Sequence, residues 1–357
     1  MLKRIGPVAL VAAGVVMLFY LKVLSSHDWN PRAFILERPP GVPVSKRGNV
    51  GYDGQYSYML AINPLGSVNG LDQPAYRYQR IVYPMVVKLF SLGQAGWVPW
   101  VMVAVNLAAT IWGCAALGIL IARRGRSPWL ALVFILSIGY LLAIRVDLNE
   151  PLTFALALSG WLAFEEGSLA LSVVLFALSG LSKEVGLVFP AALAVCEFFG
   201  RHARKGLALL TSFVPYALWY MYLFFAFGAT EEARAQSHLM WIPFSGIQYV
   251  TDQAQLVVVS IWVLGPALLA GAWAAWDAWR GQDVFRRDAF MVIAQAALVA
   301  TMPQPTWVDP LAILRIGLGL LAGLLVWLAS AHPRWLPIAA GLWLSSGLMM
   351  TLIPGLL

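Results

Sequence analysis

Charged residues are scarce in this chain of 357 residues: they make up 11% of it, against about 25% in an ordinary soluble domain, while hydrophobic residues make up 60%. This balance excludes a soluble fold, because so few charges could not cover the apolar surface. The hydrophobic residues form repeated runs near the length that crosses about 30 Å of hydrocarbon. Backbone groups in lipid must bond within their own segment, and the runs lack β-barrel alternation, so we expect an all-α bundle of transmembrane helices.

Cysteine and histidine are also scarce, which argues against a disulfide framework and a metal centre. Cys114 and Cys196 both lie inside apolar runs, where cysteine is usually a small buried hydrophobe. The sequence lacks a Walker phosphate loop, a Gly-rich dinucleotide fingerprint, a zinc-protease His pair and any Asp-x-Asp motif, so no metal-bound nucleotide sugar is expected. The four histidines have no metal-ligand spacing: His27, His202, His238 and His332.

The net charge of +7 does not predict a nucleic-acid partner, because the basic residues are dispersed between the hydrophobic runs. We expect about ten or eleven spans. Three of them, 151–164, 168–181 and 289–302, are short for a full crossing, and the sequence leaves open whether they cross. The predicted spans are 5–24, 98–121, 128–144, 151–164, 168–181, 185–199, 206–228, 255–276, 289–302, 311–330 and 336–354.

The positive charges predict the orientation. With the N-terminus in the cytoplasm, twelve basic residues fall in cytoplasmic segments and four in short outer segments, as expected for a multi-pass protein of a bacterial inner membrane. The apolar run after Lys3 and Arg4 has no small-residue cleavage site, so we interpret it as an uncleaved first span. The weak point is the turn at residues 165–167, which has no basic residue. If that hairpin did not cross, the cluster at 201–205 would face outward.

The chain is expected to form one transmembrane domain, 1–357, with a first extracytoplasmic loop at 25–96. This loop is rich in Tyr, Pro and Gly and is too short for a large core of its own. Residues 82–92 form an amphipathic stretch that we place in the interface, with Lys88 facing water. The absence of internal repeats argues against a secondary transporter built from inverted repeats.

The most informative stretch of the first loop is residues 51–58, where Asp53 lies between two glycines and among tyrosines. Glycine permits tight turns beside a ligand, and Tyr52 and Tyr56 offer flat faces and hydroxyls to a sugar ring. The alternative is a surface turn with interfacial tyrosines. Downstream, Arg77 and Arg80 share a face if their segment is helical, which suits a phosphate or pyrophosphate. Anchoring against lipid headgroups is the alternative for this pair.

Further ionisable residues interrupt or flank the spans, where they usually mark a pathway or a site. The alternative is simple loop solubility or local ion pairing. The predicted topology places all of them at the outer face, so we expect one outward-facing polar cavity. They are Arg145, Asp147, Glu150, Lys183, Glu184, His238 and Arg315.

Residues 50–85 and 180–190 resemble the GT-C class of membrane glycosyltransferases, in an uncharacterised bacterial branch similar to protein mannosyltransferases and GPI mannosyltransferases. The resemblance rests on residues 52–56, on the stretch through 76–84, and on Ser182-Lys183-Glu184; elsewhere it rests on hydropathy. The class has an essential acid in the first outer loop, and Asp53 occupies that place. The motif carries a single acid rather than an adjacent pair, so a divalent metal is unsupported and no cofactor is predicted.

The resemblance implies that a polyprenyl-phosphate sugar, held at the membrane surface, is the donor for an inverting transfer. Asp53 would act as general base. The resemblance specifies neither the sugar, the acceptor nor the oligomeric state. The implied donor-phosphate ligands are Arg77, Arg80, Lys183 and Arg315, and the implied substrate-binding residues are Tyr52, Gln55, Tyr56, Glu150, Glu184 and His238.

Two other functions fit parts of the pattern. A transporter or flippase for a lipid-linked or anionic solute predicts charges at span centres, and the sequence has few of them. An assembly subunit without chemistry predicts that Asp53 is dispensable.

Overall fold

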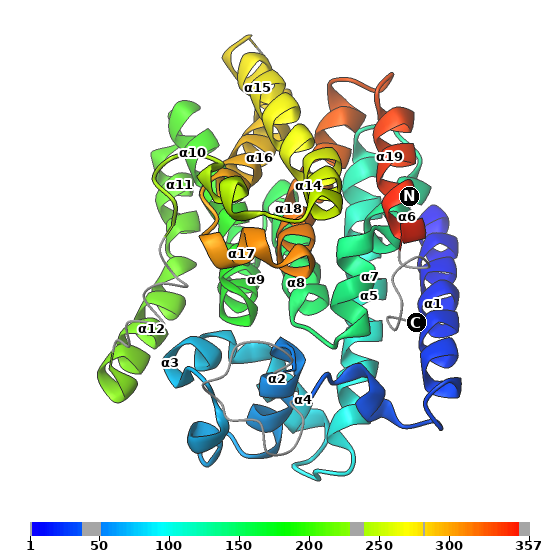
Figure 1. The fold of residues 1–357 in the computed structure, drawn as a ribbon. Coiled ribbons are helices and arrows are strands. Elements are labelled where there is room, and N and C mark those ends of the chain that lie inside the picture. The colour runs from blue at the N-terminus through cyan, green and yellow to red at the C-terminus, as the bar shows by residue number, and fades with distance from the viewer. Residues whose placement is uncertain (1, 38–50, 229–238, 281–282, 350–357) are drawn as a thin grey trace.

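The computed structural model describes residues 2–37, 51–228, 239–280 and 283–349, and this part of the chain is an all-α bundle without strands (Figure 1). The elements are α1 (Leu2–Ser25), η1 (Pro31–Phe34), α2 (Asp53–Ile62), η2 (Ser67–Gly70), α3 (Pro74–Arg77), η3 (Tyr78–Arg80), α4 (Val82–Phe90), α5 (Val98–Arg123), η4 (Pro128–Leu130), α6 (Ala131–Leu136), α7 (Ile138–Arg145), α8 (Glu150–Glu165), α9 (Leu169–Ser182), η5 (Glu184–Leu187), α10 (Val188–Phe199), α11 (Ala203–Leu210), α12 (Phe213–Phe227), η6 (Ser245–Tyr249), α14 (Gln253–Val259), η7 (Ser260–Leu264), α15 (Gly265–Arg280), α16 (Asp283–Ala300), α17 (Gln304–Val308), α18 (Pro310–Ser330) and α19 (Leu336–Leu348).

Five helical segments in the described residues are long and apolar enough to cross a membrane: Ile5–Ser25, Val98–Arg123, Ala203–Phe227, Gln253–Arg280 and Pro310–Ser330. A sixth arises if the pair α6 and α7, which is bent by 60°, counts as one span. The chain is therefore a multi-pass helical membrane protein. The remaining predicted spans also form helices, but these are shorter or extend into charged flanks, so the count of ten or eleven stays a prediction.

The predicted span 128–144 is broken because Ser137 has an extended backbone between α6 and α7. The predicted span 289–302 is longer at its start than expected, since α16 begins at Asp283 and includes a charged turn. The short predicted spans 151–164 and 168–181 are α8 and α9. Helix α8 is buried along most of its length, which places it among other helices rather than against lipid.

The turn between α8 and α9, the weak point of the predicted topology, lies at the same end of the bundle as the turn after α5. Arg124 pairs with Glu165 at 2.5 Å and with Asp288 of α16 at 2.6 Å, and Arg123 pairs with Glu166 at 2.5 Å. The cations that this turn lacks are thus supplied by the turn after α5. At the other end of the hairpin, Asn149 and Ser182 lie beside the first loop, so α8 and α9 together reach both ends of the bundle.

The first loop forms a layer of short helices, α2, α3, η3 and α4, across one end of the bundle (Figure 1). The amphipathic prediction for 82–92 corresponds to α4, whose Tyr83 and Val87 are buried and whose Leu89 and Phe90 are exposed. The expectation that Lys88 faces water is wrong. Lys88 is half-buried, and its Nζ donates to the Ile62 carbonyl at 3.2 Å, where a cation satisfies the end of α2.

Gly54 lets α2 approach the turn between α7 and α8. A Cβ at this position would lie 2.4 Å from the carbonyl oxygen of Val146 and 3.0 Å from that of Asp147. Both atoms belong to the backbone and cannot swing away. The glycine beside Asp53 is therefore a packing requirement of the chain, and the place of Asp53 depends on this contact.

Replacing Gly54 with Ala should lower the free energy of unfolding by about 1–3 kcal/mol, because the clash forces a backbone shift. Thermal unfolding of the purified protein in detergent measures it. Gly14→Ala is the matched control, since a Cβ at Gly14 meets nothing within 4 Å. That variant should unfold at the wild-type temperature or slightly above it. Equal stability of the two variants would contradict the packing role.

Asp147 sits behind α2 in a buried polar cluster and is 1% exposed. Its Oδ1 accepts a hydrogen bond from Tyr83 Oη at 2.8 Å and another from Asn106 Nδ2. Burial raises the pKa of the Asp147 carboxyl to about 7, although these two hydrogen bonds oppose the shift. Among the described residues, Asp147 Oδ2 and Asn106 Oδ1 have no partner. A proton on Asp147 would supply the missing donor.

Replacing Asp147 with Asn should therefore be tolerated, because an amide imitates the neutral acid. In the folded wild type the pKa of Asp147 is raised, so the stabilisation from its protonated form is complete below about pH 4. This stabilisation is lost as the pH rises through 7. Relative to wild type, the melting temperature of Asp147→Asn should be higher at pH 8 than at pH 5. Asp147→Ala, which removes the oxygen that both Tyr83 and Asn106 donate to, should destabilise at both. A pH-independent difference for Asp147→Asn would contradict a neutral Asp147.

Candidate active site

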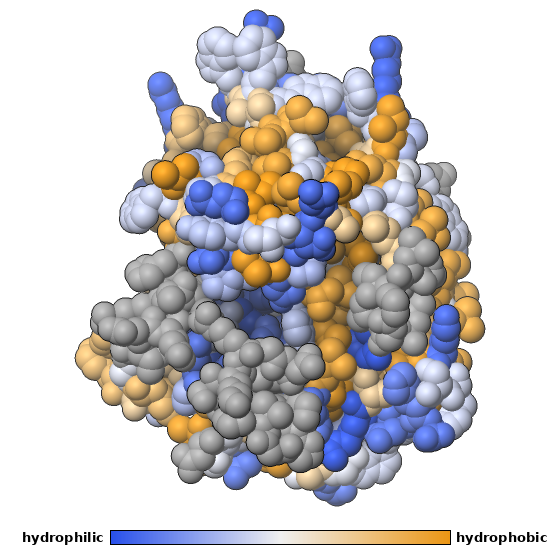
Figure 2. All heavy atoms as spheres, viewed as in Figure 1, coloured by the Kyte–Doolittle hydropathy of each residue, from blue (hydrophilic) through white to orange (hydrophobic). Residues whose placement is uncertain are grey.

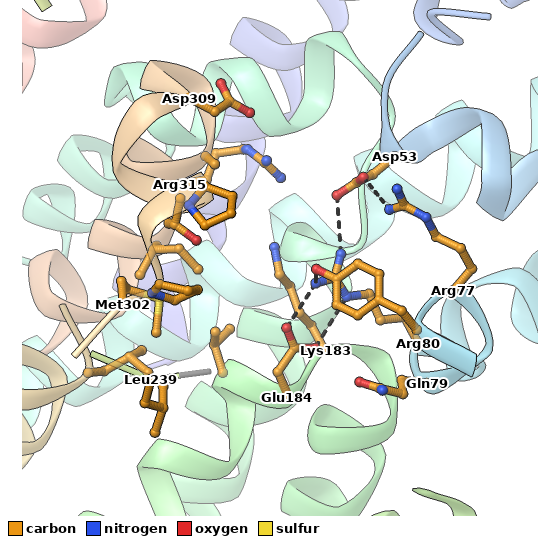
Figure 3. A pocket seen from close by; sticks show the side chains of 18 of the residues that line it. Asp53, Arg77, Gln79, Arg80, Lys183, Glu184, Leu239, Met302, Asp309 and Arg315 are labelled. Atoms are coloured by element: carbon orange, nitrogen blue, oxygen red, sulfur yellow. Dashed lines mark hydrogen bonds and ion pairs between the residues drawn. The ribbon is translucent and has the colours of Figure 1, made fainter. Parts of the chain in front are cut away.

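A polar cavity of about 460 Å³ lies between the first-loop layer and the helices above it. Figure 2 shows it as a hydrophilic hollow near the middle of this face, and Figure 3 shows most of its side chains. Its walls come from segments far apart in the chain. They are Tyr52, Asp53, Tyr76, Arg77, Gln79, Arg80, Lys183, Glu184, Val185, Tyr216, Tyr220, Leu239, Leu298, Met302, Pro303, Pro305, Thr306, Asp309, Ala312, Arg315 and Ile316.

Asp53, the first residue of α2, is held by two arginines. Its Oδ1 lies 2.6 Å from Arg77 Nη1, and its Oδ2 lies 3.1 Å from Arg80 Nη1 (Figure 3). Burial would raise the pKa of this carboxyl. The arginines, together with Arg315 and Lys183 farther away, outweigh burial and hold the pKa of Asp53 well below its usual range. Asp53 is therefore a fixed anion that orders the cations around it.

Each of these arginines has a second acid that fixes its guanidinium plane. Arg77 donates two hydrogen bonds to Asp72, at 2.8 and 2.7 Å, and lies 3.9 Å over the ring of Tyr56. Arg80 donates two to Glu184, at 3.2 and 2.8 Å. Such bidentate pairs fix orientation as well as charge. Tyr76 Oη accepts from Arg80 at 2.6 Å, which closes this side of the cavity.

A second cation cluster surrounds Glu150, the first residue of α8. Its Oε1 accepts from Lys183 Nζ and from Arg315 Nη1, both at 2.5 Å, so one carboxylate serves two cations. Glu150 is 1% exposed and lies beneath the cavity wall rather than on it. Lys183 occupies the extended turn between α9 and η5, and its ammonium points into the cavity between Asp53 and Arg315 (Figure 3).

Tyr52 joins this cluster to Asp309. Its hydroxyl accepts from Arg315 Nη2 at 2.6 Å and donates to Asp309 Oδ2 at 2.8 Å. Asp309 is also the N-cap of α18, because its Oδ1 accepts from the Leu311 amide at 2.9 Å. Arg315 and Asp309 lie across the cavity from Asp53 and Arg77 (Figure 3).

The rest of the wall is aromatic and apolar. Tyr216 and Tyr220 come from α12, and Tyr216 Oη donates to Gln79 Oε1 at 3.2 Å. Leu239 and Met302 lie across the cavity from Gln79 and Arg80 (Figure 3), and Ile316 also lines it. A charged region thus faces an apolar one within a single cavity, which suits a ligand that has both a polar head and a hydrocarbon tail.

The structure brings most of the predicted site together. The predicted residues that line the cavity are Tyr52, Asp53, Arg77, Arg80, Lys183, Glu184 and Arg315. Of the others, Gln55 is buried in α2, Tyr56 supports Arg77 from outside the cavity, Glu150 lies beneath the wall, and His238 falls outside the described residues. Arg145 and Asp147 do not line the cavity; Arg145 Nη1 donates to the Ala33 carbonyl at 2.7 Å.

Sequence reasoning did not select Tyr76, Asp309, Tyr216 or Tyr220 as site residues. For Asp309 a signal was present, since an Asp before Pro at the start of an apolar run predicts a helix cap. For Tyr216 and Tyr220, two tyrosines in an aromatic span carry no such signal. In the described part of the chain, no group of three or more His, Cys, Asp or Glu side chains is placed to hold a metal ion.

Comparison of the chain with models of protein families, with curated proteins and with solved structures gives no match. The chemistry of the cavity is therefore argued from its geometry.

Proposed function

We propose that the protein is a membrane glycosyltransferase of the GT-C kind, which moves a sugar from a polyprenyl-phosphate donor to an acceptor hydroxyl at the extracytoplasmic face. The observation that supports it is the cavity itself: a cluster of acids and cations beside an apolar wall, at one end of a membrane bundle. Its volume of about 460 Å³ suits a small polar headgroup.

The donor phosphate would bind at Lys183 and Arg315. Among the described residues, the single hydrogen-bond partner of Lys183 Nζ is Glu150, so two of its three N–H groups can reach a ligand. Lys183 and Arg315 share that one carboxylate as their ion-pair partner. Arg77 and Arg80, also predicted as phosphate ligands, are engaged by acids and would complete the site from the other side.

The prenyl tail would leave past the tyrosines of α12. Helix α12 borders the cavity through Tyr216 and Tyr220, while Leu218 and Phe225 on the same helix are 61% and 78% exposed, as expected for a helix that faces lipid. A lipid-linked donor can therefore keep its tail in the bilayer while its headgroup occupies the cavity.

In the reaction, the acceptor oxygen forms a bond to the anomeric carbon as the bond from that carbon to the phosphate oxygen breaks. The electron pair of the broken bond stays on the polyprenyl phosphate, whose charge Lys183 and Arg315 would stabilise. The hydroxyl proton goes to a carboxylate of the cavity. A direct displacement of this kind inverts the anomeric centre.

The test is a turnover assay on the protein in lipid nanodiscs, with a panel of radiolabelled polyprenyl-phosphate sugars and candidate hydroxyl acceptors. We expect at least one of the lipid donors to release free polyprenyl phosphate. We expect no sugar transfer when a nucleotide sugar is the donor. Flux of the labelled lipid across proteoliposomes without any release would overturn the proposal and favour a flippase.

A further inference from the structure

The transfer needs a proton acceptor on the cavity wall, and the acids of the site differ in how far their partners oppose protonation. Asp72 and Glu150 do not line the cavity. That leaves Asp53, Glu184 and Asp309 as the carboxylates in the described residues that can meet an acceptor hydroxyl there.

Two of these three are held by cations. Each oxygen of Asp53 accepts from a different arginine, Arg77 or Arg80, and both oxygens of Glu184 accept from Arg80. To take a proton, either acid would lose the charge that attracts its arginine, whose side chain is only 11% exposed, and would weaken the charge-assisted bonds between them. The contacts of Asp53 and Glu184 therefore suit acids that position arginines rather than an acid that accepts a proton.

Asp309 is bound differently. Its Oδ2 accepts from the neutral hydroxyl of Tyr52, and its Oδ1 accepts from a backbone amide. The nearest cation in this chain of contacts, Arg315, donates to the Tyr52 oxygen and not to the carboxylate. A proton can therefore add to Asp309 Oδ2 without breaking an ion pair, since Tyr52 can turn its hydroxyl away and accept from the new O–H.

We infer that Asp309 is the general base of the transfer, held in place by Tyr52, and that Asp53 instead positions Arg77 and Arg80. The inference rests on the proposed function. As the acceptor oxygen attacks the anomeric carbon, its proton moves to Asp309 Oδ2 and the leaving electron pair moves to the donor phosphate. The acceptor then lies beside Asp309 and the phosphate beside Lys183. Arg315, which contacts both Tyr52 and Glu150, lies between them. If Asp309 served only as the N-cap of α18, a substitution that keeps the cap would leave kcat unchanged.

The experiment is Asp309→Asn in the nanodisc assay. Asn caps a helix as well as Asp does, so the variant should fold, but its amide cannot take the proton. We expect kcat to fall by about 10²–10⁴-fold, with the donor KM within threefold of wild type. Asp252→Asn is the matched control, because Asp252 caps α14 in the same manner and does not line the cavity. It should retain full activity.

A second variant gives an independent measurement. Tyr52→Phe removes the hydroxyl that holds Asp309 Oδ2 in place, so kcat should fall at least about tenfold while the donor KM stays within threefold of wild type. Arg315 also loses its bond to the Tyr52 hydroxyl in this variant but keeps its ion pair with Glu150.

The inference is overturned if Asp309→Asn keeps more than half of the wild-type kcat, or if its loss is confined to KM. An unchanged kcat in Tyr52→Phe would also overturn it. Failure of the proposed function is a separate result: the wild type itself would release no polyprenyl phosphate.

Discussion

Replacing Asp53 with Asn should lower kcat/KM for the lipid donor at least about 100-fold, and most of the loss should appear as a higher KM. Asn keeps the shape of the side chain but removes the charge that Arg77 and Arg80 share. The two guanidiniums, each 11% exposed, would then lose the acid that bridges them and repel one another, so each would shift toward its own second acid, Asp72 or Glu184. Because its pKa is held below its usual range, Asp53 keeps this role at every pH above about 4.

The donor KM and kcat, measured separately in nanodiscs, decide between the two roles of Asp53. A loss of kcat at constant KM would show that Asp53 is the general base that the sequence predicts. Glu37→Gln is a suitable control, because Glu37 belongs to the same loop and pairs with Arg32 on the exposed surface. Surface pairs contribute little, so this variant should match wild type.

The grouping of the site could be predicted, because charges in a membrane protein must find partners. Asp53, Arg80, Lys183 and Arg315 lie in segments that share only the predicted outer side, and the structure brings all four to one cavity. The same rule explains the opposite end of the bundle. The acidic turn at Glu165 needs cations, and they come from a turn some forty residues earlier in the chain.

The roles within the site could not be predicted, since they depend on which atoms meet. The sequence places Arg77 and Arg80 on one face, yet Arg77 pairs with the nearby Asp72 and Arg80 with the distant Glu184. Asp53 bridges the two arginines. Glu150 looked like a cavity residue because it follows a span. It is instead buried beneath the wall, because two helices, α8 and α18, and the turn after α9 converge on it.

The count of spans shows a related limit. Hydropathy detects each apolar run, but it does not distinguish a helix that faces lipid from one surrounded by protein. Helix α8 is buried over most of its length, and α12 is exposed over most of its length, although both are strongly apolar. The length rule applies to lipid-facing helices, so it cannot settle the short interior ones.

Replacing Glu150 with Gln should cause the largest loss of stability of any single neutral substitution at the site. Its carboxylate is the shared partner of Lys183 and Arg315, whose side chains are 5% and 4% exposed. Removing one partner of a buried ion pair costs about 3–5 kcal/mol, because the remaining charge is left without compensation. Here two cations would be left, and they would also repel each other.

Thermal or denaturant unfolding in detergent measures this loss, and Glu166→Gln is the control. Glu166 has a comparable contact to Arg123 at 2.5 Å, but it is 49% exposed, so its loss should change stability by less than about 1 kcal/mol. The double variant Glu150→Gln with Lys183→Met should recover part of the stability, because it leaves one buried cation rather than two. If Glu150→Gln unfolds at the wild-type temperature, water already compensates Lys183 and Arg315. The phosphate site proposed between them would then be solvated, and its attraction for an anion would be correspondingly weak.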